Sequence, residues 1–441
     1  MKTYENYKDS GIEWIGEIPE HWEKINFNHY VFLRHGYQFR DYDFTQSGLK
    51  IIKITQLLSN GNLETEKVSF IDLTRLENFS DIIINEGDIL MALTGGTIGK
   101  IIRVPQVNEP LLQNYRVGNF FPLDEDKLDK NFLFWVLSSD LILKQIFYDQ
   151  RETGQPNIGK EDFGRMRIIL PKTIKEQTAI ANYLDKKTAE IDQLISEKEE
   201  LVQLYQEEKT AIINQAVTKG INPDVKLKES GIEWLGDIPE HWDAVSLKWV
   251  SNIYSGGTPS KNKPEYWTNG TIPWLNSGTV NQWDITEASE YITEEALSNS
   301  SAKWIPEKAI LMALAGQGKT KGMVAQVQFK CTCNQSMGVI IPNNKIDNRF
   351  LLYWLKRNYQ NIRNLGGGDK RDGINLEMIG GIPIPFFSVS EQAEIVVHIE
   401  KESARIDAKI AKAEKYINLL TEYRTALISE VVTGKIKVVD G

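Results

Sequence analysis

Apolar residues recur at intervals of three and four residues in two stretches of the chain, at 184–216 and 399–431. Both stretches predict a long helix, and residues 175–218 contain no glycine or proline that would break it. At 1.5 Å per residue, about 40 residues would form a helix of about 60 Å. A seven-residue repeat of apolar positions is typical of coiled coils. The seam, meaning the apolar line along each helix, is predicted to contain Leu184, Ile191, Ile195, Val202, Ile212, Ile399, Ile406, Ile410, Ile417, Leu420 and Leu427.

Polar residues interrupt both seams, as expected where the register of a helix pair is set. They are Lys198, Lys209, Ser403 and Arg424. The two helices have the same length and phase, which favours antiparallel pairing with each other. The alternative is that each amphipathic helix packs only on its own globular domain.

Short β-branched runs and turn clusters occupy the sequence before each long helix. Residues 49–55, 81–93 and 165–170 read as strands. The stretches 129–148 and 347–365 read as helices. The expected class is therefore α+β.

The chain contains an internal repeat. Residues 7–23 and 227–243 share 12 of 17 aligned positions, and both include Ser-Gly-Ile-Glu-Trp and Ile-Pro-Glu-His-Trp. An Ile-Leu-Met-Ala-Leu run and a Glu-Gln pair recur later in the same order. A duplicated chain predicts two similar units about an approximate two-fold axis. The expected divisions are globular domains at 1–170 and 218–385, followed by helical segments at 171–217 and 386–441.

We call the repeated segments 7–23 and 227–243 the first and second tags. The chain continues from each long helix into a similar segment, and the segment after the first helix leads directly into the second tag. If the halves are equivalent, the C-terminal segment should lie beside Tyr7 in the first tag. The chain would then be nearly closed into a circle.

Composition narrows the class of protein. Residues 1–170 carry 19 basic and 25 acidic side chains, whereas residues 218–385 carry 18 and 17, within a total net charge of −9. A bound polyanion would meet local basic loops, or a partner would hold most of its phosphates. Cys331 and Cys333 are the only cysteines and have no zinc-ligand spacing, so no metal site is expected. No apolar run suggests a signal peptide or membrane span, and a cytoplasmic protein is expected.

No catalytic constellation stands out. The repeated His21 and His241 lie in the tags, where structural packing is the simpler interpretation. Residues 313–320 resemble a phosphate-binding loop, but the leading glycine is replaced by Ala313. A nucleotide-hydrolysing enzyme therefore stays open only as a minor alternative.

Several loops combine basic, amide and hydroxyl side chains, which hold phosphates or read base edges. Ordinary solvated turns are the alternative for each of them. The candidates in the first half are Arg34, Tyr37, Gln38, Arg40, Lys53, Thr94, Thr97, Lys100, Arg151, Gln155 and Asn157. Those in the second half are Thr258, Ser260, Lys261, Lys263, Asn276, Ser277, Gln317, Lys319, Lys370 and Arg371. Because the two sets differ in chemistry, two unlike recognition surfaces on one scaffold are expected.

The whole layout resembles the specificity subunit of type I restriction–modification enzymes. The resemblance rests on both tags, on Gly154-Gln-Pro-Asn-Ile158, on Ser255-Gly-Gly-Thr-Pro-Ser260 and on Val432-Thr-Gly-Lys435. It implies two target recognition domains separated by two long antiparallel helices, with each domain reading one half of an asymmetric double-stranded DNA site. It also implies a non-catalytic chain, present once per complex.

The resemblance further implies partners that carry the chemistry. Two methyltransferase subunits would dock on the helices, bind S-adenosylmethionine and methylate adenine at N6. Restriction or motor subunits would use ATP and Mg. A protein-binding scaffold or antirestriction decoy of the same fold, which reads no bases, is the alternative.

Overall fold

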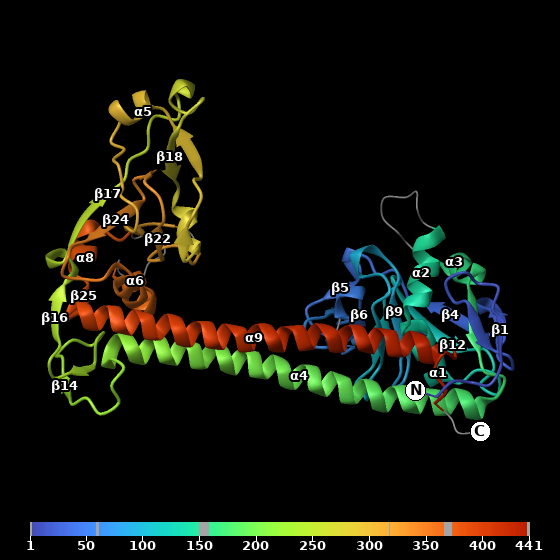
Figure 1. Cartoon of the computed structure of the whole chain (residues 1–441). Coiled ribbons are helices and arrows are strands. Elements are labelled where there is room, and N and C mark those ends of the chain that lie inside the picture. Colours follow the sequence, from blue (N-terminus) through green and yellow to red (C-terminus); the bar gives the residue numbers. More distant parts are fainter. Residues whose placement is uncertain (1, 59–60, 150–157, 317, 366–372, 439–441) are drawn as a thin grey trace. The chain divides into compact units, whose positions relative to one another are not determined.

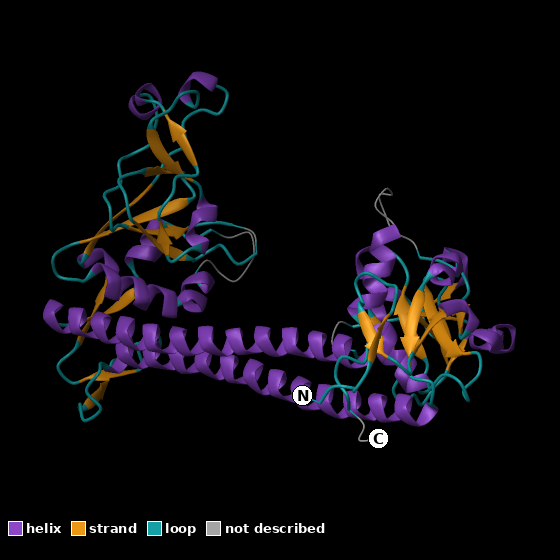
Figure 2. Ribbon diagram, turned by 45° about the vertical axis from the view of Figure 1, so that its right-hand side comes forward, coloured by secondary structure: helices purple, strands orange, loops and turns teal. Residues whose placement is uncertain are grey.

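The computed structural model describes residues 2–58, 61–149, 158–316, 318–365 and 373–438. The chain forms two compact units (Figure 1). The first unit combines Met1–Glu199 with Glu414–Gly441, and the second is Glu200–Ala413. Each unit holds a sheet-rich domain and part of both long helices (Figure 2). The α+β class predicted from the sequence is confirmed.

The two predicted long helices are α4 (Ile174–Lys219) and α9 (Val389–Val432). In the first unit, Leu184 and Ile191 of α4 share a core with Leu427 and Val431 of α9. In the second unit, buried residues of both helices join the core of the adjoining domain. The helices therefore pair with each other as well as packing on the domains, so the alternative in which each helix packs only on its own domain is wrong.

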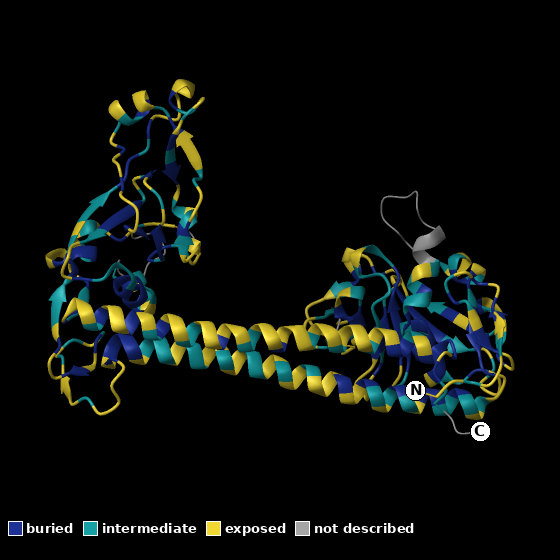
Figure 3. Ribbon diagram, in the orientation of Figure 1, coloured by how far each residue is buried: buried dark blue, intermediate teal, exposed yellow. Residues whose placement is uncertain are grey.

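Burial along the helices follows the predicted seam, with exposed residues on the outer faces (Figure 3). The fully buried seam positions are Leu184, Ile191, Ile399, Ile406 and Leu427. The half-buried ones are Ile195, Val202, Ile212, Ile410, Ile417 and Leu420. All predicted seam positions are thus buried or half-buried.

Two of the polar interruptions form ion pairs between the helices. In the first unit, Arg424 donates from two nitrogens to the two carboxylate oxygens of Asp192, at 2.8 and 3.1 Å. In the second unit, Lys209 Nζ lies 2.8 Å from both oxygens of Asp407. In the internal repeat, Asp192 corresponds to Asp407 and Lys209 corresponds to Arg424. The two ion pairs therefore occupy equivalent positions in the two halves. Charges at these positions therefore contribute to helix register, as the sequence indicated.

The first unit contains a four-stranded sheet, β10-β9-β12-β4, and a five-stranded sheet, β5-β7-β6-β11-β8. The four-stranded sheet uses β4 (Val31–His35), β9 (Ile89–Ala92), β10 (Ile101–Arg103) and β12 (Val117–Pro122). The other uses β5 (Phe44–Thr45), β6 (Leu49–Ile52), β7 (Ser69–Ile71), β8 (Ile83–Ile84) and β11 (Leu111–Gln113). Strands β6 and β11 run parallel, unlike the other pairs formed by these strands.

The second unit contains a five-stranded sheet, β17-β24-β21-β22-β19, and a three-stranded sheet, β20-β18-β23. The first of these uses β17 (Ser251–Ser255), β19 (Asp284–Ile285), β21 (Ile310–Ala313), β22 (Val324–Val327) and β24 (Met337–Pro342). The other uses β18 (Ile272–Leu275), β20 (Glu290–Ile292) and β23 (Thr332–Cys333). Strands β18 and β23 run parallel, as β6 and β11 do in the first unit.

Both shorter helical stretches predicted from the sequence are broken into two helices. The first gives α1 (Lys130–Ser138) and α2 (Asp140–Asp149), and the second gives α6 (Asn348–Arg357) and α7 (Tyr359–Asn364). At the first break Ser139 is extended, and its hydroxyl donates to Val136 O at 2.6 Å. At the second, the amide of Asn358 donates to Trp354 O at 3.0 Å. Such short polar side chains compete with backbone N–H groups for hydrogen bonds to the helix carbonyls.

Smaller elements complete each unit. They are the helices α3 (Lys160–Arg165), α5 (Glu294–Ser298) and α8 (Leu376–Gly380), and the paired strands β3 (Glu23–Asn26) with β13 (Arg167–Leu170) and β16 (Asp243–Ser246) with β25 (Pro383–Phe386). Each tag forms a hairpin, β1 (Tyr7–Asp9) with β2 (Glu17–Pro19) and β14 (Leu227–Glu229) with β15 (Asp237–Pro239).

The repeated histidine and tryptophan of each tag bind a glutamate at the start of a long helix. Glu176 of α4 accepts from Trp22 Nε1 at 3.1 Å, and its other oxygen lies 3.0 Å from His21 Nε2. Glu391 of α9 has the same two partners in the second tag, each at 3.0 Å. The tag histidines are therefore structural, as the sequence indicated.

The C-terminal segment returns to the first tag, which confirms the predicted closure. The Lys437 N–H donates to Lys2 O at 2.9 Å, and the Tyr7 hydroxyl donates to Gly434 O at 3.3 Å. Gly434 has a φ of +73°, and an added Cβ would lie 2.4 Å from Pro19. Only glycine fits this close approach.

Candidate nucleic-acid interface

The candidate site begins at the carboxyl ends of the parallel strands. Lys53 follows β6, and Asn114 follows β11, with the Asn114 N–H donating to Ile52 O at 3.0 Å. In the second unit Asn276 follows β18, and the Asn334 N–H after β23 donates to Leu275 O at 3.0 Å. Lys53 and Asn276, both predicted from the sequence, therefore occupy equivalent places.

A tight turn follows β11 in the first unit and β23 in the second. We call residues 114–116 and 334–336 the hub turns. The Val117 N–H donates to Asn114 O at 3.0 Å, and the Met337 N–H donates to Asn334 O at 3.3 Å. The loops predicted from the sequence meet at these turns.

In the first unit, main-chain hydrogen bonds tie two loops to the hub turn directly and a third segment to one of those loops. The Tyr115 N–H donates to Tyr37 O at 2.9 Å, which brings in the loop after β4. The Leu93 N–H donates to Arg116 O at 3.0 Å, which brings in the loop at 94–100. The Ile158 N–H donates to Leu93 O at 2.9 Å, so the segment that begins at Ile158 lies beside the second of these loops.

The second unit repeats this arrangement. The Gly257 N–H donates to Cys333 O at 2.8 Å, immediately before the hub turn. The Leu314 N–H donates to Ser336 O at 2.8 Å, and the Ile374 N–H donates to Leu314 O at 2.7 Å. Loops with unlike sequences therefore converge in the same way in both units.

A glycine permits the first of these approaches in each unit. A Cβ on Gly36 would lie 1.9 Å from Gln113 O, and a Cβ on Gly256 would lie 2.3 Å from Cys333 O. Since no side chain fits at such distances, the loop can lie against the neighbouring strand only with glycine there.

Beside the first hub turn, the predicted loop residues differ in how accessible they are. Tyr37, Gln38 and Arg40 are exposed. Arg34 instead points into the domain, where it donates to Gln113 Oε1 at 3.0 Å and Ile83 O at 2.8 Å. Burial lowers the pKa of Arg34 from its usual value. These contacts favour a structural role for Arg34.

The remaining described candidates of the first unit lie at the edge of the loops. Lys53 Nζ donates to Ser69 Oγ at 2.8 Å and lies 4.3 Å from the Phe44 ring centre. The Thr97 hydroxyl donates to Thr94 O at 3.2 Å, which tightens the turn that leads to Lys100. Gly99, with φ +82°, brings this loop against Leu143 of α2.

The loop after β17 supplies four of the seven described candidates in the second unit. The Thr258 hydroxyl donates to Gln335 Oε1 on the hub turn. Lys261 Nζ binds Glu290 at 2.7 Å and lies 3.5 Å from the Trp267 ring centre. Lys263 Nζ donates to the Tyr266 hydroxyl at 3.1 Å. The carbonyl of Ser260 accepts from Trp267 Nε1 at 3.2 Å and so stabilises the loop.

Asn276 and Ser277 begin a short 3-10 helix at 277–281. The Asn276 side chain caps this helix by accepting from the Gly278 N–H at 2.9 Å. Asn276 is exposed and Ser277 is half-buried.

The loop that resembles a phosphate-binding motif joins two antiparallel strands, β21 and β22. In a true motif the lysine and the hydroxyl residue open a helix, which cradles the phosphates. Here Lys319 is exposed, and its carbonyl accepts from the Tyr359 hydroxyl at 2.5 Å. The nucleotide-hydrolysing alternative therefore lacks its structural context.

Six predicted candidates lie outside the described residues. They are Arg151, Gln155, Asn157, Gln317, Lys370 and Arg371. Conversely, sequence reasoning did not select His35, Tyr115, Arg116 or Gln335, which lie on or beside the hub turns. Each hub turn begins with an asparagine, Asn114 or Asn334, and lies between two short apolar runs. The recurrence of this pattern at equivalent places in both halves is the signal that would have identified these residues.

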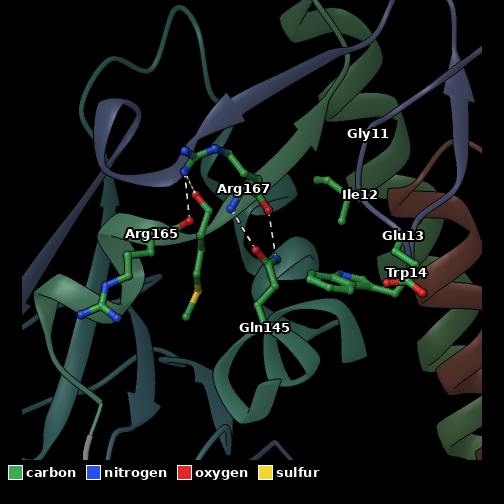
Figure 4. A pocket seen from close by; sticks show the side chains of 8 residues that line it. Gly11, Ile12, Glu13, Trp14, Gln145, Arg165 and Arg167 are labelled. Atoms are coloured by element: carbon green, nitrogen blue, oxygen red, sulfur yellow. Dashed lines mark hydrogen bonds between the residues drawn. The ribbon is translucent and has the colours of Figure 1, made fainter. Parts of the chain in front are cut away.

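Outside the loops, a pocket of about 300 Å³ lies between the first tag and α2 (Figure 4). Gln145 crosses its floor, accepting from the Arg167 N–H at 2.9 Å and donating to Arg167 O at 3.0 Å. The Arg167 guanidinium donates to the carbonyls of Arg165 and Met166. These contacts hold β13 in place, and they pair no nucleophile with a base.

Among the described residues, no group of three His, Cys, Asp or Glu side chains is placed to hold a metal ion. Cys331 and Cys333 are buried, and burial raises the pKa of the Cys331 thiol to about 12. Within the described ranges, no helix is both long and apolar enough to cross a membrane.

Comparison with known proteins identifies relatives for both halves. A family model described as type I restriction modification DNA specificity domain matches residues 20–204 and again 239–415. The MjaVIII specificity subunit of Methanocaldococcus jannaschii is 32% identical over 207 residues, which are 46% of this chain and 47% of that protein. The putative MjaX specificity subunit of the same organism is 25% identical over 98% of this chain and 97% of its own. The chain thus spans about half the length of the first relative and nearly all of the second.

A solved structure from work on complex assembly and conformational transition in the type I R-M system has a related fold. Its TM-score is 0.71 at 15% sequence identity, and the match covers 95% of this chain and 99% of that one.

Proposed function

Because this chain belongs to the type I restriction modification DNA specificity family, we propose that it is the sequence-recognition subunit of a type I restriction–modification complex. Each sheet domain would read one half of a bipartite DNA duplex site. The observation that carries this proposal is the same convergence of unlike loops on the hub turn of each unit. A shared framework with different side chains suits two readers with different targets.

We assign residues 1–170 and 218–385 to the two recognition domains, and 171–217 and 386–441 to the helices that would set the gap between half-sites. A continuous helix such as α4 is a stiff element, which suits a fixed gap. The helices would also dock two methyltransferase subunits, which bind S-adenosylmethionine and modify adenine. Restriction or motor subunits using ATP and Mg complete the proposed assembly, and a cytoplasmic location remains a prediction.

The charge distribution fits a chain that depends on partners for phosphate binding. The first recognition domain is net acidic, whereas the second carries nearly equal numbers of basic and acidic side chains. Since phosphate contacts supply much of the affinity for DNA, the methyltransferases would contribute a large share of it. The chain itself would contribute sequence preference more than affinity.

Selection of bound duplexes from a random library, by the chain together with its modification subunits, tests this proposal. The expected result is two specified blocks of different sequence separated by a gap of constant length. Affinity should fall steeply with salt. Binding without any sequence preference would instead favour the protein-binding scaffold or decoy, and nucleotide binding by the isolated chain would favour the enzyme alternative.

A further inference from the structure

We propose that the hub turns themselves carry base-reading side chains, Arg116 for one half-site and Gln335 for the other. This inference rests on the proposed function and specifies which residues determine the target. It concerns residues that neither the sequence motifs nor the family description selects.

The first argument is position. Each hub turn follows the carboxyl end of a strand that pairs in parallel with its neighbour, β11 or β23, and main-chain hydrogen bonds at or beside the turn tie it to neighbouring loops. A side chain on the turn is therefore carried by backbone that neighbouring segments hold in place. Rigid support of this kind is what a base-reading group needs, because a misplaced donor loses its discrimination.

The second argument is the chemistry at the first hub turn. Arg116 is exposed, and its side chain has no ion pair with any described residue. By contrast, Arg75 and Arg103 pair with carboxylates at 2.8 and 3.2 Å. An unpaired guanidinium matches O6 and N7 of guanine in the major groove.

The neighbours of Arg116 stabilise this turn. The ring of Tyr115 stacks on His35 with centres 5.5 Å apart and an angle of 29° between the planes. His35 Nδ1 lies 3.4 Å from Tyr115 O. Burial lowers the pKa of His35, which favours its neutral ring beside the guanidinium.

The third argument is the contrast with the second hub turn. Counting along the repeat, Gln335 occupies the place of Tyr115 and Ser336 that of Arg116, so the cation is replaced by an amide and a hydroxyl. The Thr258 hydroxyl donates to Gln335 Oε1, which orients the amide. A glutamine amide matches N6 and N7 of adenine. The equivalent turns thus present different chemistry in the two units, at neighbouring positions.

The test is to repeat the duplex selection with Arg116→Ala and with Gln335→Ala, each in the complex with modification subunits. Arg116→Ala should reduce preference for guanine at one position of one half-site by about 5- to 150-fold, the range of one bidentate contact. Gln335→Ala should do the same for adenine in the other half-site only. Gln335→Glu should change the preferred base from adenine to cytosine, because a carboxylate accepts from the cytosine amino group.

Matched controls separate base reading from general loss of structure. Arg165→Ala removes an exposed arginine of the first unit, and Gln360→Ala removes an exposed glutamine of the second. Both should retain the parental consensus. Circular dichroism of each variant reports whether it is folded.

The outcomes distinguish this inference from the proposed function. If the parental complex selects two blocks but both hub-turn variants keep every base preference, the inference fails and the proposed function stands. Weaker binding with an unchanged consensus would show phosphate contacts instead, and would overturn base reading. If the parental complex selects no sequence, the proposed function fails as well.

Discussion

Two buried glutamines explain why the Glu-Gln pair recurs in the sequence. Gln177 accepts from the Asp129 N–H at 2.8 Å and donates to the carbonyls of Lys127 and Pro171. Gln392 makes the equivalent bond with the Asp347 N–H at 2.7 Å. Each glutamine therefore joins the start of a long helix to the cap of a domain helix. The recurrence of the Glu-Gln pair was evident from the sequence. Its hydrogen-bond partner was not, because that residue is distant in the chain.

Replacing Gln177 should destabilise the first unit. Gln177→Leu leaves an N–H and two carbonyls without their partner, which should lower the free energy of unfolding by about 3 kcal/mol. Gln193→Leu is the control, because Gln193 is exposed and its amide donates to Glu197 on the same helix. Urea unfolding followed by circular dichroism measures both. Equal stability of the two variants would contradict this role.

Lys356 predicts a pH dependence of stability in the second unit. Burial lowers its pKa to about 8, Arg349 adds to the shift, and Asp284 opposes it. Between about pH 8 and the ordinary lysine value, the folded state releases the proton while the unfolded state retains it. The unfolded state then binds more protons, so stability should rise with pH in this window.

The comparison is between the wild-type chain and Lys356→Gln, by urea unfolding at pH 7.5 and pH 9.5. The stability of the wild type relative to the variant should be greater at the higher pH. Lys248→Gln is the control and should show no such change, since Lys248 lies at the domain surface near Trp249. A relative stability that falls with pH would show that the sign is wrong.

The long helices show which interactions hold a pair together and which set its register. Ile406 is fully buried, whereas the Lys209–Asp407 pair beside it lies at the surface. Apolar burial contributes several kcal/mol per side chain, and a surface ion pair contributes about 0–1 kcal/mol. The seam therefore supplies most of the stability, and the charges favour one alignment over others.

Ile406→Ala should lower the free energy of unfolding by about 2–5 kcal/mol, because it removes buried methylene groups and leaves a cavity. Asp407→Asn should lower it by about 1 kcal/mol or less. Differential scanning calorimetry of the two variants gives the comparison. A larger loss for Asp407→Asn would mean that charge, and not apolar packing, holds the helices.

The sequence predicted the helices well and their surroundings less well. Seam residues such as Leu184 and Ile399 repeat over several turns, so their burial follows from periodicity alone. The helix interruptions at Ser139 and Asn358 depend on single side-chain hydrogen bonds. The spacing of apolar residues contains no information about such bonds. The hub turns were missed for a third reason. Their importance comes from strands distant in the sequence, and a residue such as Arg116 looks locally like any exposed turn residue.

For the complete chain, the contact between Lys2 and Lys437 has a direct experimental consequence. Joining these ends with a short flexible linker and opening the chain between residues 220 and 226 should retain the fold, since no long helix is cut. The permuted protein should unfold at nearly the wild-type temperature, as measured by calorimetry.

A second permuted chain opened between residues 200 and 201 is the control. This cut interrupts α4, so a lower unfolding temperature is expected. Failure of the first permuted protein to fold, with its linker intact, would contradict the equivalence of the two exits from the long helices.

The matching hydrogen bonds around the two hub turns also bear on how a target could be changed. Gly36 and Gly256 admit the same close approach, and Leu93 and Leu314 make the same main-chain bond. A set of loops transplanted from one unit to the other would therefore find an equivalent frame. If the chain reads DNA as proposed, a variant carrying one set twice would have no reason to prefer unlike half-sites, and both blocks of its preferred duplex would carry the same sequence.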